Sequence, residues 1–234
     1  MADDVNALDY LKQHDELSRR FSDCLDGDLS VPVVHCGEWT LRDLAGHVGQ
    51  GNAWVVGAIR EHRKDRGGTP PPAEDAGVRA WFEGMVAELA DALALDPETD
   101  VWTFWPPHTV GFWRRRRVHE MQVHVWDAEH AAGKEAPLDP AFAADGVAEV
   151  LDTMAPRQVK VERMAAPQRA VRLTASDTGG SWTWGPGEPV GEVTGTAERL
   201  LLQLWKRIPA DDPSLSWSGD VEGTRAVLAG ALAP

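Results

Sequence analysis

The chain has 234 residues, of which 43% are hydrophobic and 26% charged, and its formal net charge at pH 7 is −14. This length suffices for one large or two small domains, and no apolar run approaches the ~18 residues of a membrane-spanning helix. Without such a run we expect no membrane partner. The acidic balance opposes binding to phosphate backbones, so we expect no nucleic-acid partner. The acidic start, MADDVNALDYLKQHDE, lacks the basic and apolar segments of a secretory signal, and we expect a cytoplasmic protein.

The first half of the chain predicts four long helices. Apolar residues recur at helical spacing over residues 3–26, 40–64, 76–95 and 110–132. Thr40 and Asp43 form a shortened relative of a capping box at the start of the second helix, and Gly133 suits the end of the fourth. The glycines and prolines of residues 66–75 interrupt regular structure. Four helices of this length favour a bundle, whose core brings side chains of facing helices together.

From about Pro137 the pattern changes to a mixture of helix and strand. The expected elements are a helix over 140–154, strands over 170–176, 181–185 and 190–195, and helices over 196–207 and 223–232. We therefore predict an α+β protein, with a four-helix bundle over residues 1–136 and a small mixed α/β domain over residues 137–234.

The segment HEMQVHVWDAEH, residues 119–130, carries the strongest functional pattern. Positions three and four apart are neighbours on a helix, so Glu120, His124 and Asp127 share one face. A carboxylate and an imidazole at this spacing are typical of a metal site, and His47 on the second helix is the candidate third ligand. Three protein ligands leave one coordination position open for chemistry. The alternative is that His47 is an ordinary histidine satisfied by hydrogen bonds.

Two acidic residues lie where they could orient these histidines. Asp127 follows His124 by three residues, and Asp43 precedes His47 by four, so each could accept the ring hydrogen of the histidine nitrogen that does not bind metal. The alternatives are a salt bridge and, for Asp43, helix capping, which is equally expected in a first helical turn.

Four consecutive arginines, residues 114–117, point around the whole fourth helix. At most one or two of them can face a cleft, while the others are solvated or paired with acids. Arg117 is the best candidate for the site because it lies three residues before Glu120.

Cys24 and Cys36 are too few for a disulfide framework and lack a zinc-binding CxxC spacing. We expect both to be buried free thiols, with a reactive thiol at Cys36 as the alternative.

Taken together, the segments WTLRDLAGHVG, TVGFWRRRRVHEMQVHVWDAEHAAG, LLLQLWKR and WSGD resemble the mycothiol-dependent maleylpyruvate isomerase family. The resemblance implies an N-terminal DinB-like bundle and a C-terminal sterol-carrier-like domain. It places a divalent metal, usually zinc, on His47, Glu120 and His124, and it gives Arg207 the task of binding a substrate carboxylate. Lys206 stands where glycine is common in the family.

The resemblance also implies a mechanism and partners. Mycothiol would supply a thiol, which the metal holds as thiolate for addition to a small, carboxylate-bearing electrophile. Elimination after bond rotation would give cis–trans isomerisation of the maleylpyruvate type, and retention of the sulfur would give S-transfer. Two alternatives stay open: a hydrolase that uses a metal-bound water of lowered pKa, and a non-catalytic module that binds a small ligand or a protein.

Overall fold

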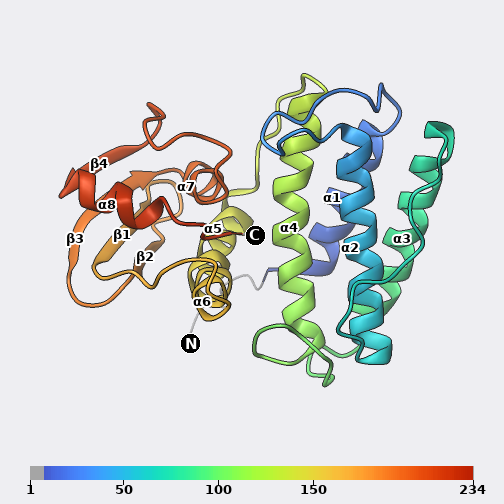
Figure 1. Cartoon of the computed structure of the whole chain (residues 1–234), viewed down its shortest axis with the longest axis horizontal. Helices are drawn as coiled ribbons and strands as arrows, with labels where there is room; N and C mark the ends of the chain where they lie inside the picture. Colours follow the sequence, from blue (N-terminus) through green and yellow to red (C-terminus); the bar gives the residue numbers. More distant parts are fainter. Residues whose placement is uncertain (1–7, 234) are drawn as a thin grey trace, which may run out of the picture. The chain divides into compact units, whose positions relative to one another are not determined.

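The computed structural model describes residues 8–233, and the chain divides into two compact units between Ala136 and Pro137. The first unit is a helical bundle, and the second combines helices with a four-stranded mixed sheet (Figure 1). This architecture confirms the predicted α+β class. Among residues 8–233, no helix has both the length and the apolar character that crossing a bilayer requires.

The bundle consists of α1 (Tyr10–Cys24), α2 (Leu41–Glu61), α3 (Val78–Leu93) and α4 (Val110–Ala131). Helix α1 packs against α4, α2 packs against α3, and α2 also contacts α4 (Figure 1). The first helix was expected from Asp3, but it begins after its cap at Asp9, and positions 3–7 lie outside the described residues. A short 3-10 turn, Asp75–Gly77, precedes α3. The contact between α2 and α4 is what brings the candidate site together.

Local capping fixes where α2 begins and ends. The Thr40 hydroxyl accepts a hydrogen bond from the Asp43 backbone N–H, and the Asp43 carboxylate accepts one from the Thr40 backbone N–H, which completes the predicted capping box. The helix ends at Glu61, three residues before the predicted end, because His62 adopts a left-handed conformation with φ of 51°.

An aromatic cluster packs the N-terminal end of α4 against α2. Trp113 contacts Trp54 edge-on at a ring separation of 5.3 Å, and its indole N–H donates to the Trp102 carbonyl at 2.8 Å. Phe104 and Phe112 complete the cluster. Large aromatic side chains remove much apolar surface from water, so this cluster stabilises the bundle beside the site.

The sheet of the second unit contains β1 (Ala170–Ala175), β2 (Ser181–Trp184), β3 (Pro189–Gly195) and β4 (Ser216–Gly219). Their order is β2-β1-β3-β4, with β1 parallel to β3 and the other two pairs antiparallel. The sequence pattern predicted the first three strands but not β4.

The helices of the second unit differ from prediction at their ends. They are α5 (Pro140–Glu149), a π-helical segment (Val150–Met154), α6 (Ala155–Lys160), α7 (Ala197–Leu204) and α8 (Val221–Leu228). The helix expected to end at Met154 thus continues to Lys160. Helix α7 stops before Arg207 because Lys206 has a φ of 60°. Helix α8 begins earlier than predicted because the Asp220 side chain caps it through the Gly223 N–H.

Candidate metal centre

Helices α2 and α4 bring three predicted ligands together. His47 lies on α2, and Glu120 and His124 lie one turn apart on α4. Ligand atoms of the three side chains all lie within 4.8 Å of one another. His47 Nε2 is 3.5 Å from Glu120 Oε1, and the two imidazole centroids are 5.2 Å apart. Donors around a tetrahedral zinc lie roughly 3.3 Å from one another, so this set fits a metal ion after small side-chain adjustments.

The group is only partly shielded from solvent. The His47 side chain is 25% exposed and that of Glu120 17%, while His124 is buried. The Trp39 ring covers His47 at a centroid separation of 4.9 Å. Two nitrogens and one carboxylate therefore meet at a place that an external ligand can reach, which is the donor arrangement of a zinc site with an open position.

Two arginines keep Glu120 ionised. Arg117 donates to Glu120 Oε2 at 2.7 Å, and Arg116 lies 3.6 Å from the same oxygen. Burial raises the pKa of the Glu120 carboxyl, but Arg117, a hydrogen bond from His47 and Arg116 together hold it well below its usual range. A carboxylate that is already charged is ready to bind a cation without first losing a proton.

Arg117 itself lies inside the bundle. Its residue exposure is 1%, and besides Glu120 it donates to Asn52 Oδ1 at 2.5 Å. Burial lowers the pKa of its guanidinium, and the neighbouring Glu120 opposes that shift. The structure therefore brings Arg117 to the predicted site, but places it against the carboxylate of Glu120, one of the predicted ligands.

Asp127 makes the contact that the sequence predicted for it. Its Oδ2 lies 3.0 Å from His124 Nδ1. Burial lowers the pKa of His124, with Asp127 acting in the opposite direction. A neutral His124 that donates from Nδ1 to this carboxylate carries no hydrogen on Nε2, and the lone pair of Nε2 is the donor that a metal requires.

Asp43 caps α2, and this settles the choice that the sequence left open. Its carboxylate accepts the backbone N–H and the hydroxyl of Thr40, at 2.9 and 2.7 Å. These bonds hold the pKa of Asp43 below its usual value.

Sequence reasoning missed two neighbours of this group, Trp39 and Cys36. Both lie in the segment between α1 and α2, where helical periodicity gives no information. Cys36 was expected to be buried, but it is only half-buried, and its Sγ lies 3.6 Å from Asp127 Oδ2. Cys24 is buried as expected.

Arg207 belongs to the second unit and follows the end of α7. Its Nη1 donates to the Trp205 carbonyl at 2.9 Å, and its guanidinium lies 5.7 Å from the centre of the Trp205 ring. These contacts restrain the side chain, and the carboxylate-binding role stays a prediction.

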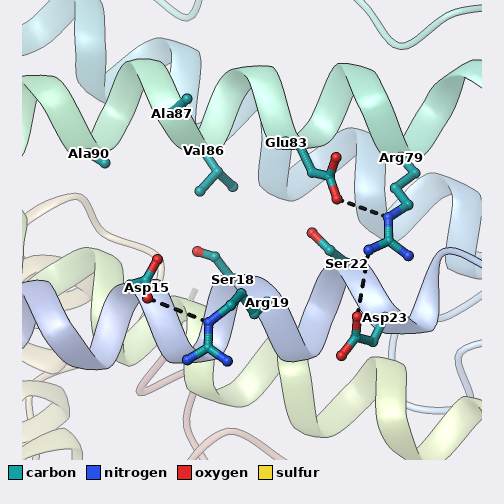
Figure 2. A pocket seen from close by; sticks show the side chains of 10 residues that line it. All are labelled: Asp15, Ser18, Arg19, Ser22, Asp23, Arg79, Glu83, Val86, Ala87 and Ala90. Carbon is teal, nitrogen blue, oxygen red and sulfur yellow. Dashed lines mark hydrogen bonds and ion pairs between the residues drawn. The ribbon is translucent and has the colours of Figure 1, made fainter.

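A groove of about 470 Å³ lies between α1 and α3, and its lining contains none of the three predicted metal ligands, His47, Glu120 and His124. Figure 2 shows its mouth lined by charged side chains, with Arg19 paired to Asp15 and Arg79 paired to both Asp23 and Glu83. Because these charges are already paired within the groove, its lining offers no donor set comparable to the group on α2 and α4.

A helical bundle with a histidine–glutamate–histidine group, followed by a mixed α/β unit, defines a class of two-domain proteins with a candidate metal centre in the bundle. Residues 10–129 match the mycothiol maleylpyruvate isomerase (MDMPI) N-terminal domain. Residues 141–230 match the MDMPI C-terminal domain of the same family. The chain belongs to the mycothiol maleylpyruvate isomerase family.

Two solved structures share the fold. One is a crystal structure of the mycothiol-dependent maleylpyruvate isomerase, with a TM-score of 0.68, and the other is a histidine-to-alanine mutant of that enzyme, with a TM-score of 0.65. Each is 15% identical to this chain and aligns over 91% of this chain and 93% of its own. No curated protein matches the sequence.

Proposed function

We propose that this protein is a mycothiol-dependent isomerase whose divalent metal is held by His47, Glu120 and His124. The observation that carries the proposal is the convergence of these three side chains from two helices, with ligand atoms within 4.8 Å. Two imidazoles and one carboxylate suit zinc among the available divalent ions. Membership of the family supports mycothiol as the thiol and isomerisation as the reaction class.

An open metal position fits this chemistry for a simple reason. A free thiol has a pKa near ~8.5, so little of it is nucleophilic at neutral pH. A bound divalent cation lowers that pKa and keeps the cofactor's sulfur deprotonated. The reaction that follows is cis–trans isomerisation of a small electrophile of the maleylpyruvate type, or S-transfer if the sulfur stays on the product. A thiol cofactor requires a reducing compartment, which supports a cytoplasmic location.

The residues around the ligands orient them. Asp127 accepts the Nδ1 hydrogen of His124 and so directs Nε2 toward His47 and Glu120. Arg117 fixes the Glu120 carboxylate from inside the bundle. Arg117 is thus a positioning residue in this proposal, since its side chain donates to the proposed ligand Glu120, to Asn52 and to the Val48 carbonyl.

Arg207 is the residue that we propose for the substrate carboxylate. Its planar guanidinium offers paired N–H donors that match a carboxylate. The hydrogen bond to the Trp205 carbonyl and the nearby indole ring restrain it, which reduces the entropy lost when it binds an anion.

Isothermal titration of mycothiol into zinc-loaded protein tests the proposal. The titration is repeated in two buffers of different ionisation enthalpy, because a thiol that binds as thiolate releases a proton. We expect saturable binding with buffer-dependent heat, lost in His124→Ala and kept in the matched control His130→Ala, an exposed histidine of the same helix. Turnover that persists after all small thiols are removed would contradict the proposal and favour hydrolysis.

A further inference from the structure

A second set of potential metal ligands lies beside the first. Cys36, His124 and Asp127 also have ligand atoms within 4.8 Å of one another. Cys36 Sγ is 3.6 Å from Asp127 Oδ2, and that oxygen is 3.0 Å from His124 Nδ1. Helical periodicity does not predict this set, because Cys36 comes from the segment between α1 and α2.

These distances suit a tetrahedral ion. With bond lengths of ~2.3 Å to sulfur and ~2.0 Å to nitrogen and oxygen, neighbouring ligands lie about 3.5 Å apart for sulfur–oxygen and about 3.3 Å for nitrogen–oxygen. The two separations that involve Asp127 Oδ2 differ from these by only a few tenths of an ångström, and ligand atoms of Cys36 and His124 lie within 4.8 Å of each other. A thiolate and a carboxylate also balance the charge of a divalent cation, which matters because His124 and Asp127 are buried.

We propose that Cys36, Asp127 and Nδ1 of His124 form a second cation site, selective for thiophilic divalent ions, that competes with the first site for His124. Thiolate sulfur selects softer ions, whereas Glu120 and the two imidazoles of the first site form a harder set. Cd²⁺ and Co²⁺ have the chemistry to occupy the second site, as does zinc in excess.

Competition follows from the chemistry of one imidazole ring. A neutral imidazole has a lone pair on one nitrogen and a hydrogen on the other. An ion at Nδ1 therefore moves the ring hydrogen to Nε2, the nitrogen that the first site needs, while the Cys36 thiol gives its proton to solvent. The competition extends the proposed function, since an ion at the second site removes a ligand from the first.

Cobalt binding tests the second site without measuring activity. Metal-free His47→Ala protein, in which the first site has lost a ligand, is titrated with Co²⁺ alone. Thiolate ligation produces intense sulfur-to-cobalt charge-transfer absorption in the near ultraviolet, which imidazole and carboxylate ligands do not give. We expect this band in His47→Ala, its loss when Cys36→Ala is added, and its retention when Cys24→Ala is added as the matched control.

Two results would overturn the second site. One is a folded His47→Ala protein, checked by circular dichroism, that shows no charge-transfer band when saturated with Co²⁺. The other is a band that survives Cys36→Ala and disappears with Cys24→Ala. Failure of the proposed function is seen separately, because mycothiol titration of zinc-loaded Cys36→Ala protein reports on the first site alone.

Discussion

The first turn of α4 buries apolar side chains alone, whereas its later turns bury charged and polar side chains among apolar ones. Its first turns contribute Phe112 and Trp113 to an aromatic cluster, whereas its later turns bury Arg117, His124 and Asp127. Apolar burial stabilises a fold, but buried charges cost free energy unless each is paired. We therefore expect substitutions in the first turn of α4 to lower stability, and substitutions of its buried polar residues to weaken metal binding.

His124→Ala removes a proposed ligand and should have the largest effect on zinc binding and turnover. The loss of a direct ligand should weaken zinc binding by more than the ~100-fold that loss of an outer partner can cause, and thiol-dependent turnover should disappear with it. Competition with a chromophoric chelator measures the affinity. The control His130→Ala should bind zinc as wild type does. Wild-type zinc affinity in His124→Ala would contradict the proposal that His124 is a ligand.

Trp113→Ala, in the first turn of α4, should lower stability and leave zinc binding unchanged. Removing a buried Trp should lower the free energy of unfolding by about 3–5 kcal/mol, because Trp113 is 1% exposed and contacts four other aromatic residues. Urea denaturation measures the change. The folded fraction should keep wild-type zinc affinity. A loss of affinity without a loss of stability would contradict the expectation that Trp113 stabilises the fold and does not contribute to metal binding.

Asp127→Asn tests whether the charged partner of His124 matters. The substitution keeps the size of the side chain but removes the charge that supports the imidazole, so zinc affinity should fall about 10- to 100-fold. The same chelator competition measures it. An unchanged affinity would show that the contact between Asp127 Oδ2 and His124 Nδ1, at 3.0 Å, does not strengthen zinc binding.

His14 should make the bundle sensitive to acid. Burial, with a smaller contribution from Arg117, lowers the pKa of His14 to about 3, whereas an unfolded histidine has a pKa near ~6.5. Between these values the unfolded state binds more protons, so the stability that is complete above pH ~6.5 is lost as the pH falls, by about 2 kcal/mol at pH ~5.

Urea denaturation at these two pH values, in wild type and in His14→Gln, measures the contribution of His14. The difference between pH ~7 and pH ~5 should be about 2 kcal/mol smaller in His14→Gln. The exposed His130 provides the control substitution, His130→Gln. An equal pH dependence in wild type and His14→Gln would show that His14 does not cause it.

Interactions local in the chain could be predicted from the sequence. The capping box that Thr40 and Asp43 form and the approach of Glu120 to His124 both follow from helical spacing. The approach of His47 required one further step, the expectation that two amphipathic helices face each other in a bundle.

Other features depend on tertiary structure or on single backbone angles. Cys36 meets Asp127 across 91 positions of the chain, and no periodicity encodes that contact. The left-handed Lys206 ends α7 early although neither it nor its neighbours is glycine, and the π-helical segment continues a helix that the apolar pattern ends at Met154.

Zinc-edge X-ray absorption tests most directly whether a metal on His47, Glu120 and His124 binds the sulfur of the cofactor. Cys36→Ala protein is loaded with one equivalent of zinc and measured before and after mycothiol is added. The substitution removes Cys36 as a source of sulfur. We expect a shell of nitrogen and oxygen alone in the first spectrum, and one sulfur at about 2.3 Å in the second. Zinc that stays bound but gains no sulfur would contradict the claim that this centre activates a thiol.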